Sequence, residues 1–320
     1  MKKSLLFSTL LLSLLPIHAE EPKGLFIDPA EAAKADADFS IQGEYAGSIA
    51  GKKHGLQLVA EGDGKFLAIL YPGGLPGAGW DGNKASRVKG TAGNGKSAVR
   101  ISLGSLEGTA KDGKVTFGSD SLEKITRSSP TMGAKPPAGA VVLFDGSNTD
   151  AWNGSGMTDE KLLKEGQDSK QKFGSYHIHL EFMLPYKPKA RGQDRGNSGF
   201  YNQSRFEVQV LDSFGLEGEN NECGGIYSIK APDLNMCLPP LVWQTYDIDF
   251  TAATFDASGK KTANARTTVK HNGTVIHDNI ELPHATTAAP LGDGKDPGPL
   301  HLQNHGNPIR YRNIWLVEKK

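Results

Sequence analysis

The residues with the clearest capacity for chemistry lie in a short predicted strand at 206–210, which reads Phe-Glu-Val-Gln-Val. Successive side chains of a strand point to opposite faces, so the three apolar residues share one face while Glu207 and Gln209 share the other. The carboxyl and the carboxamide would lie about 6.6 Å apart, at a rise of ~3.3 Å per residue. Such a pair can exchange protons with a polar ligand and hydrogen-bond its hydroxyl groups. A half-buried strand with a solvated polar face would show the same alternation.

Two further predicted strands repeat this division into an apolar and a polar face. Their polar faces carry His177, His179 and Glu181 in residues 177–182, and His301, Gln303 and His305 in residues 300–305. Histidine titrates near neutral pH and therefore suits proton transfer as well as binding. Several strands of this kind, placed side by side, would form a concave polar surface that suits a sugar.

The remaining sequence predicts an all-β protein with two domains. Short alternating runs are separated by Gly, Pro, Asp-Gly and Asn-Gly, which is typical of antiparallel hairpins. Residues 24–128 predict a small antiparallel β-domain that begins with one short helix at 29–35. Residues 129–138, which are rich in proline, predict a linker. Residues 139–319 predict two packed antiparallel sheets, that is, a sandwich or jelly roll.

The charge balance and the N-terminal residues restrict the possible partners and location. Lys plus Arg and Asp plus Glu each number 36 in 320 residues, so there is no basic excess for nucleic acid or an anionic membrane. Residues 1–19 combine two lysines, an apolar run and a final Ala19, as in a secretory signal peptide. This apolar run is too short for a membrane span, and no other long apolar stretch occurs in the sequence. We therefore expect an exported protein, either periplasmic or extracellular.

Cys223 and Cys237 are the only cysteines. In an exported chain they either form a disulfide, which would stabilise a short loop by roughly 3 kcal/mol, or remain as two buried thiols. Two cysteines alone do not indicate a metal site. The sequence leaves both states open.

Seven motifs occur in one order in residues 139–319. They are Gly196-Asn197-Ser198-Gly199, Phe206 to Asp212, Gly224-Gly225-Ile226-Tyr227, Trp243 to Asp247, Asn272-Gly273, Leu302 to Gly306 and Arg312-Asn313-Ile314. With these motifs, the C-terminal domain resembles the 3-keto-disaccharide hydrolase family, also described as 3-keto-glucoside 1,2-lyase/3-keto-2-hydroxyglucal hydratase. The resemblance implies a concanavalin A-like jelly roll, which agrees with the predicted strands. It does not extend to residues 24–128.

The resemblance also implies a reaction on a sugar that is oxidised at C3. The ketone acidifies the proton at C2, so the glycosidic bond can leave by β-elimination, and water then adds to the product. This chemistry needs a base, an acid for the leaving oxygen and a group that stabilises the enolate. Glu207 and His305 are the candidates for base and acid, in either order. Arg312 or a bound divalent ion is the candidate for the enolate, and a structural ion pair is the alternative role of Arg312.

The other candidate residues would hold the substrate. Gln209, Asn197 and Gln303 are assigned to sugar hydroxyl groups, and Asn197 has the alternative of shaping a turn. The predicted binding surface is completed by His179, His301, Asp212 and Trp243.

Two other functions compete with this prediction. Glu207, Gln209 and Asp212 resemble the catalytic strand of laminarinase-type retaining glucanases on the same fold, with Gln and Asp substituted. Such enzymes need two carboxyl groups about 5–5.5 Å apart, which Glu207 and Asp212 would reach only across a bulge. A carbohydrate-binding protein without activity is the second alternative, because this fold also carries lectins. The polar faces hold more histidine and glutamate than aromatic residues, which favours an enzyme.

Overall fold

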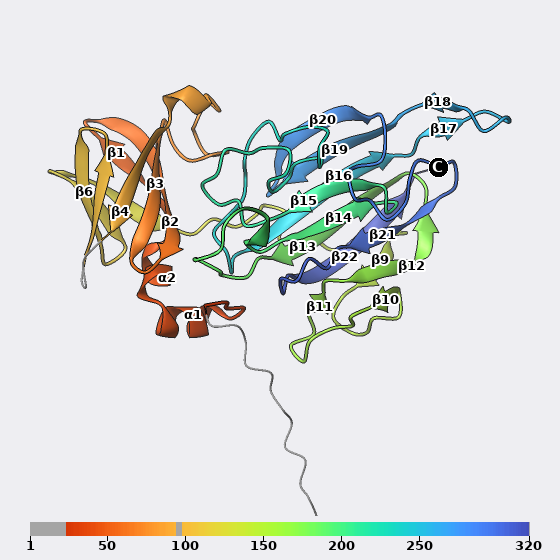
Figure 1. Cartoon of the computed structure of the whole chain (residues 1–320), viewed down its shortest axis with the longest axis horizontal. Helices are drawn as coiled ribbons and strands as arrows, with labels where there is room; N and C mark the ends of the chain where they lie inside the picture. The colour runs from red at the N-terminus through yellow and green to blue at the C-terminus, as the bar shows by residue number, and fades with distance from the viewer. Residues whose placement is uncertain (1–23, 94–97, 320) are drawn as a thin grey trace, which may run out of the picture.

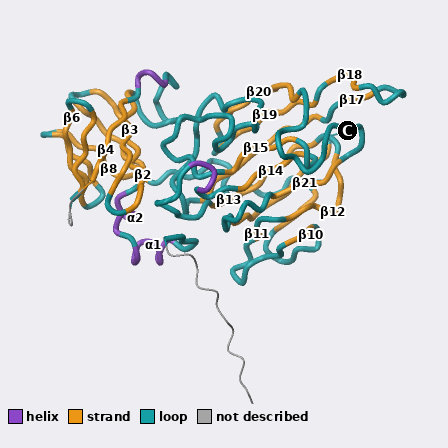
Figure 2. The backbone as a smooth tube through the Cα atoms, in the orientation of Figure 1, coloured by secondary structure: helices purple, strands orange, loops and turns teal. Residues whose placement is uncertain are grey.

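Two β-domains lie side by side in the computed structural model, which describes residues 24–93 and 98–319 (Figure 1). A β-barrel, coloured red to yellow, precedes a larger β-sandwich. Figure 2 shows that helix is confined to a few short turns. The all-β prediction, with a jelly-roll sandwich after a small β-domain, is confirmed. The predicted signal segment, residues 1–19, lies outside the described residues, and no described helix is long and apolar enough to cross a membrane.

The barrel is a closed antiparallel sheet. Its strands are β1 (Gly43–Ile49), β2 (Lys52–Gly62), β3 (Lys65–Pro72), β4 (Val88–Gly93), β5 (Val99–Leu103), β6 (Leu106–Lys111), β7 (Lys114–Phe117) and β8 (Asp120–Ile125), and β8 closes on β1. Asp63-Gly64 and Asp112-Gly113 turn two of its hairpins, and all four residues have positive φ, as type I′ turns require. Two short helices, α1 (Pro29–Ala35) and α2 (Ala37–Ile41), precede the barrel.

The sandwich consists of two antiparallel sheets, here called the small sheet and the large sheet. The small sheet contains, in spatial order, β10 (Trp152–Gly154), β12 (Gln167–Phe173), β21 (Gly298–Leu302), β14 (Ser198–Asn202) and β15 (Phe206–Val210). The large sheet contains β11 (Leu163–Lys164), β22 (Arg310–Glu318), β13 (Tyr176–Met183), β16 (Trp243–Thr251), β19 (Ala265–His271) and β20 (Thr274–Leu282), with β9 (Val141–Phe144) also on β22. The elements are completed by the pair β17 (Thr254–Phe255) and β18 (Lys261–Ala263) and by the 3-10 turns η1 (Lys84–Ser86) and η2 (Gly192–Asp194).

The hydrophobic core lies between the two sheets and continues into the barrel wall. Phe200 and Val208 of the small sheet and Ile178 of the large sheet are completely buried in it. The same cluster contains Val59 and Ile69, which lie on the barrel strands β2 and β3. Apolar burial contributes about 25 cal/mol per Å². The barrel and the sandwich therefore stabilise each other through shared apolar contacts.

The proline-rich segment between the domains is packed on the outer face of the large sheet. The Thr131 hydroxyl donates to Asp247 at 2.7 Å, and the Gly133 N–H donates to Glu181 at 2.6 Å. Further side-chain contacts to this segment come from Thr245, Asn313 and Trp315. Residues 129–134 are here called the strap. Hydrogen bonds with side chains of the large sheet hold the strap against that sheet.

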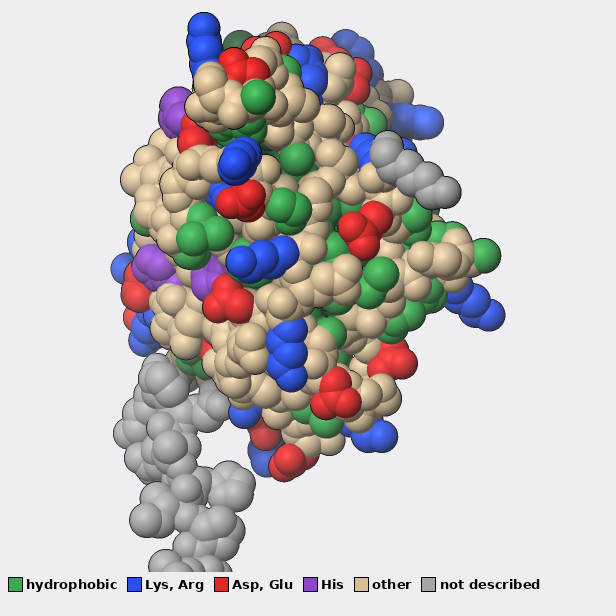
Figure 3. Space-filling view, turned by 90° about the vertical axis from the view of Figure 1, so that its right-hand side faces the viewer, with side chains coloured by type: hydrophobic (Ala, Val, Ile, Leu, Met, Phe, Trp, Pro, Cys, Tyr) green, Lys and Arg blue, Asp and Glu red, His purple; other side chains and the backbone are tan. Residues whose placement is uncertain are grey.

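Acidic and basic side chains are interspersed over the end of the sandwich that faces the viewer in Figure 3. This distribution agrees with the equal totals of 36 cationic and 36 anionic residues in the sequence. The face shown thus offers no extended surface of one charge.

Candidate active site on the small sheet

Four polar side chains form a row across neighbouring strands on the outer face of the small sheet. The strand register pairs Asp168 of β12 with His301 of β21, and His301 with Tyr201 of β14. Tyr201 is in turn paired with Glu207 of β15. Directly paired residues lie on the same face with Cβ atoms about 4.5–5.5 Å apart, so neighbours in the row can contact one another. The apolar residues that alternate with them fill the core and hold the row on the outside.

Glu207 is an enclosed acid at one end of the row. Only 2% of its surface is exposed. Its carboxyl lies over Gly199 of the adjacent strand, where an added Cβ atom would stand 2.2 Å from Oε1. Glycine at this position therefore provides the space for the acid. Removal from water raises the pKa of Glu207 from 4.5 to about 8, and a hydrogen bond with Tyr201 only partly opposes this shift. The carboxyl is consequently protonated for the most part at neutral pH.

The enclosed acid should make the stability of the fold depend on pH. The folded state keeps the Glu207 proton up to about pH 8, whereas the unfolded chain releases it near the ordinary pKa of 4.5. Between these values the folded state binds more protons, so raising the pH favours unfolding. Urea unfolding at about pH 5 and about pH 8 should show a larger loss of stability for the wild type than for Glu207→Gln. Equal losses in both proteins would contradict a neutral, enclosed Glu207.

Tyr201 connects Glu207 to the rest of the row. Its hydroxyl accepts a hydrogen bond from Gln303 Nε2 at 3.0 Å and also forms a hydrogen bond with the Glu207 carboxyl. Burial, with a smaller contribution from Glu207, raises the pKa of the Tyr201 hydroxyl, which therefore stays protonated. The backbone N–H of Gln303 donates to the Gly199 carbonyl at 2.9 Å, so the pairing of β21 with β14 continues beyond the end of β21. A chain of mutually polarised hydrogen bonds thus leads from Gln303 through Tyr201 to the acid.

His301 and Asp168 form a histidine–carboxylate pair on the other side of Tyr201. His301 Nδ1 lies 2.9 Å from Asp168 Oδ1. A carboxylate in this position favours the tautomer with hydrogen on Nδ1, which leaves a lone pair on Nε2. The His301 side chain is 18% exposed, and its ring meets the Tyr201 ring edge-on with 5.2 Å between centroids. His301 is therefore oriented as a base on the face that carries the buried acid.

Carboxamide side chains border the row near β15. Gln209 Nε2 approaches Gln193 Oε1 at 3.2 Å, and Gln193 Nε2 donates to the Asn221 carbonyl at 2.8 Å. Asn197 Nδ2 donates to the carbonyl and to Oε1 of Gln193, at 2.9 and 3.0 Å. Asn197 Oδ1 is buried and has no hydrogen-bond partner among the described residues. These amides bind mainly one another and nearby backbone, and Asn197 Oδ1 is an acceptor left for a further partner.

Two predicted site residues on the small-sheet side lie outside this row. His305 is exposed in the loop that follows β21. Asp212, just beyond β15, forms a buried ion pair with Arg195, whose Nε lies 2.7 Å from Asp212 Oδ2. The structure therefore places Asp212 in an internal ion pair, and the strand register places His301, and not His305, in the row with Glu207.

Three other predicted residues, His179, Trp243 and Arg312, lie on the outer face of the large sheet, across the core from the row. His179 Nδ1 lies 2.7 Å from Asp247 Oδ1. Arg312 Nε donates to Glu181 at 2.7 Å, and the guanidinium lies 3.9 Å from the Trp243 ring centroid, a cation–π contact. The structure does not bring Arg312 to Glu207. Its contacts support the structural ion pair that the sequence left open.

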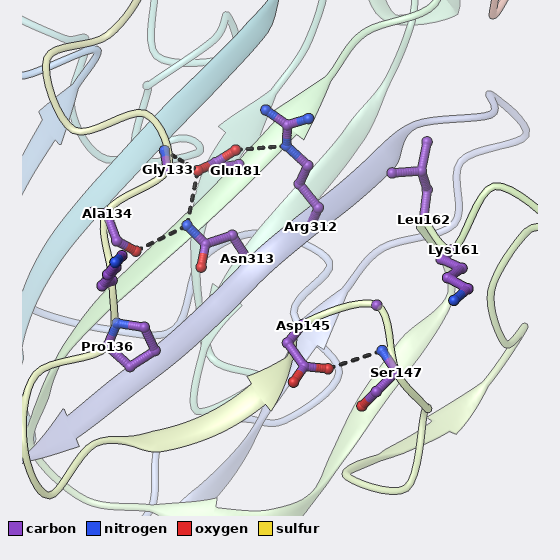
Figure 4. A pocket seen from close by; sticks show the side chains of 12 residues that line it. Gly133, Ala134, Pro136, Asp145, Ser147, Lys161, Leu162, Glu181, Arg312 and Asn313 are labelled. Carbon is purple, nitrogen blue, oxygen red and sulfur yellow. Dashed lines mark hydrogen bonds and ion pairs between the residues drawn. The ribbon is translucent and has the colours of Figure 1, made fainter.

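A hollow of about 600 Å³ lies beside this ion pair, between the strap and the loop of Asp145 (Figure 4). Burial of Glu181 opposes its ionisation, but hydrogen bonds from His179, Asn313 and Arg312 outweigh burial and lower the pKa of Glu181 to about 2. Glu181 therefore remains a carboxylate that anchors the strap, and it cannot act as a proton donor near neutral pH.

Two further points from the sequence concern the cysteines and a bound metal ion. Cys223 and Cys237 are both buried and free, so the structure contains thiols and no bond between them. The Cys223 sulfur lies 3.2 Å from the Tyr246 hydroxyl. In the part of the chain that the structure describes, no group of three or more His, Cys, Asp and Glu side chains is placed to hold a metal ion.

The predicted site residues did not include Asp168, Tyr201 or Gln193. Tyr201 follows Gly199 by two positions and hence shares its face, so the alternation in this motif was an available signal. Asp168 belongs to a strand with several charged residues, which made it indistinguishable from a solvated aspartate. Gln193 lies in the turn η2 and reaches the site only through tertiary contacts.

The family model described as the 3-keto-alpha-glucoside-1,2-lyase-like domain matches residues 139–317. The chain belongs to this family. A crystal structure of a proposed glycosyl hydrolase from Parabacteroides distasonis ATCC 8503 is similar to it, with 33% identity and a TM-score of 0.52 over 57% of this chain and 85% of that chain. Two further proposed glycosyl hydrolases from the same organism show 16% and 20% identity, with TM-scores of 0.41 and 0.39, over 57% and 56% of this chain and 94% and 99% of theirs. The comparison with curated proteins gives no match.

The 3-keto-alpha-glucoside-1,2-lyase-like domain coincides with the sandwich and leaves out the barrel. Its family and its solved neighbour identify a carbohydrate-active enzyme of the glycosyl hydrolase-like kind. A carbohydrate is therefore the expected class of substrate, and the row on the small sheet is the place to look for its chemistry.

Proposed function

We propose that the protein cleaves 3-keto-glycosides by elimination across C1 and C2 followed by hydration. The row on the small sheet carries this proposal, because it sets a carboxyl that is protonated near neutral pH beside a histidine–carboxylate pair. Elimination from a 3-keto sugar requires one group that accepts the C2 proton and another that donates to the leaving oxygen. His301 and Glu207 are suited to these two tasks.

In the elimination step, His301 accepts the C2 proton, and the electrons of the C–H bond form an enolate with the C3 carbonyl. The C1–O bond then breaks, and Glu207 gives its proton to the departing oxygen. Asp168 holds the His301 ring through Nδ1 and so keeps Nε2 directed to the sugar. Two strand spacings, about 9.6 Å, separate β15 from β21, and Tyr201 of β14 lies between them, so the sugar would reach acid and base across the Tyr201 side chain.

In the hydration step, the same two groups work in the opposite sense. The Glu207 carboxylate takes a proton from a water molecule as the water oxygen adds to C1. The His301 imidazolium returns its proton to C2, and both residues regain their starting protonation states. Gln193 Nε2 spends one N–H on the Asn221 carbonyl, and its second N–H would donate to the C3 oxygen or a sugar hydroxyl, where a fixed donor stabilises developing negative charge.

Entry of the sugar must displace part of the cover over the acid, since Glu207 and Tyr201 are 2% and 1% exposed. Tyr227 belongs to this neighbourhood, and its N–H donates to the Glu207 carbonyl at 3.3 Å. Exclusion of water around a bound keto sugar would protect the reactive enolate from side reactions.

We also propose that the enzyme acts outside the cytoplasm. The support is the signal-peptide pattern of residues 1–19. Detection of the mature protein in a periplasmic or extracellular fraction, with a new N-terminus near residue 20, would test this. Retention of the full-length protein in the cytoplasm would refute it.

The two competing functions find less support in the geometry. A retaining glycosidase would use Glu207 and Asp212 as its carboxyl pair. Asp212 is instead held by Arg195 at 2.7 Å. A lectin would present aromatic rings for stacking, whereas Tyr201, the aromatic residue of the row, is 1% exposed.

The experiment that tests the proposal compares a 3-keto-glucoside with its unoxidised parent as substrates of the purified protein. Loss of substrate and any enone absorbance are followed. Turnover of the keto sugar alone is the expected result. Cleavage of the parent would favour ordinary glycoside hydrolysis, and binding of either sugar without turnover would leave a lectin.

Arg312→Met tests whether the outer face of the large sheet contributes to catalysis. We expect kcat/KM for a 3-keto-glucoside to stay within about threefold of wild type, because Arg312 lies across the core from the row. Stability should fall by about 1–3 kcal/mol, since buried Glu181 loses a charged hydrogen-bond donor. Steady-state kinetics and urea unfolding measure the two effects. A hundredfold loss of kcat in a folded variant would show that Arg312 belongs to the active site.

A further inference from the structure

A long irregular segment after β15 borders the row and also reaches the barrel. We call residues 213–227 the wall segment. Its Gly224 N–H donates to the Gln209 carbonyl, and its Gly225 carbonyl accepts from the Gln209 N–H, each at 2.9 Å. The wall segment therefore pairs with the free edge of β15 and fixes the backbone of one site amide.

Two more contacts join the wall segment to the site. The Asn221 carbonyl accepts from Gln193 Nε2 at 2.8 Å, and the Tyr227 N–H bonds the Glu207 carbonyl at 3.3 Å. Displacement of the wall segment would therefore move or release the Gln193 amide. The acid and the base, by contrast, are carried by strands β15 and β21, each of which pairs with β14.

The opposite side of the wall segment is held by cations of the barrel. The Glu217 carboxylate is bound by both Arg87 and Lys89. The Arg87 side chain is only 4% exposed, and its guanidinium lies 6.0 and 5.7 Å from the ring centroids of Tyr71 and Trp80. Packing against these rings therefore fixes Arg87 on the barrel independently of its contact with Glu217. A planar guanidinium in such a site is a fixed anchor for a carboxylate.

Close packing reinforces this ionic contact. Gly215 has a φ of +76°, and a Cβ atom there would stand 2.4 Å from Val59 Cγ2 and 2.9 Å from Ile69 Cδ1. The wall backbone thus lies directly on apolar side chains of the barrel. One turn further along, the Glu222 carboxylate accepts from the Gly218 N–H at 2.6 Å. This bond links the part of the wall that touches the barrel to the part that touches the site.

We infer that the barrel is a positioning domain for the active site, and that Arg87, acting through Glu217, sets the place of the wall segment that holds Gln209 and Gln193. The inference rests on the proposed function of the row. A wall that is held in one place before the sugar arrives lowers the ordering cost of binding. Contiguous packed contacts of this kind can carry such coupling between domains.

Glu217→Gln is the lead test, because Glu217 is 34% exposed and glutamine keeps a side-chain oxygen as hydrogen-bond acceptor for the buried Arg87. We expect KM for a 3-keto-glucoside to rise about tenfold while kcat stays within about twofold, since the proton-transfer groups are carried by strands. Arg87→Met should give the same pattern. The double variant should be no worse than either single variant, as expected for two residues that act through one contact.

A second measurement needs no turnover. Backbone hydrogen exchange at Gly218, Gly224 and Gly225 should accelerate about tenfold in Glu217→Gln, because the wall opens more easily without its anchor. Arg100→Met, which replaces an exposed arginine of barrel strand β5, is the matched control and should change neither exchange nor KM.

The two readouts separate the two claims. Faster exchange with a raised KM supports the positioning role. Unchanged exchange in Glu217→Gln, or faster exchange with an unchanged KM, overturns it. If the wild type turns over no 3-keto-glycoside while exchange still accelerates, the hold of the barrel on the wall is upheld and the proposed function of the row has failed.

Discussion

Replacement of Glu207 by glutamine should lower kcat for a 3-keto-glucoside by roughly 10²–10⁴-fold, the usual contribution of a positioned acid. Glutamine has nearly the same shape and can keep the contact with Tyr201, but it has no proton to give to the leaving oxygen. The variant should therefore fold normally and still bind substrate. Steady-state kinetics, together with substrate binding measured by calorimetry, distinguish loss of chemistry from loss of binding.

The pH profile sharpens this prediction. Glu207 must be protonated to act as an acid, and burial raises its pKa to about 8. Activity of the wild type should therefore decline as the pH rises through about 8, and this decline should be absent from the residual activity of Glu207→Gln. A decline that persists in the variant would assign it to another group.

Glu165→Gln is the matched control for Glu207→Gln. Glu165 is also a partly buried carboxyl whose pKa is raised by desolvation, but it pairs with Arg310 of the large sheet at 3.2 Å. Its replacement should leave kcat within about twofold of wild type. If Glu207→Gln kept more than about a tenth of the wild-type kcat, Glu207 would not be the acid.

Arg195→Met should cause the largest loss of stability, about 3–5 kcal/mol, the usual result of leaving a buried charge without its partner. Arg195 is 5% exposed, and its Nε lies 2.7 Å from Asp212 Oδ2. Its guanidinium also donates to the carbonyls of Ala60 in the barrel and Pro188 in the sandwich, at 3.2 and 3.1 Å. The substitution thus removes an ion pair and a bond between the domains at once. The midpoint of urea unfolding measures the loss.

Two companion variants make this result specific. Arg191→Met removes a neighbouring arginine that is 52% exposed and also bonds the barrel, at the Glu61 carbonyl. It should cost less than about 1 kcal/mol, because exposed ion pairs contribute little. Adding Asp212→Leu to Arg195→Met should restore part of the stability, since no buried charge is then unpaired. A loss of less than about 1 kcal/mol in Arg195→Met would show that water reaches the Asp212 carboxylate.

The sequence by itself determined which way the side chains of each strand point. The alternation in residues 206–210 predicted that Val208 enters the core and that Glu207 and Gln209 face outward, and the structure agrees. Hydrophobic burial on one face is a local property with a period of two residues, so it can be inferred without knowledge of the partner strands. The motifs in the C-terminal half likewise predicted the family, which the family model confirms.

Only the tertiary structure decided which strands share a sheet. The patterns around His179 and Glu207 are alike in the sequence, yet β13 belongs to the large sheet and β15 to the small sheet. Pairing between distant strands depends on the long connections and on shared packing, which alternation does not encode. For this reason the sequence patterns predicted one site with Arg312, Trp243 and Glu207, although the sandwich core lies between the first two residues and Glu207.

Tertiary structure also decided the chemical state of the acid and the roles of the segments around it. Neither the space over Gly199 nor the enclosure that raises the pKa of Glu207 can be inferred from local sequence, because both arise where separate strands meet. The strap and the wall segment have no regular pattern of their own, and their positions follow from contacts with distant residues such as Glu181 and Arg87. Local alternation thus determined the faces of the strands, while non-local packing determined which of these faces form a site.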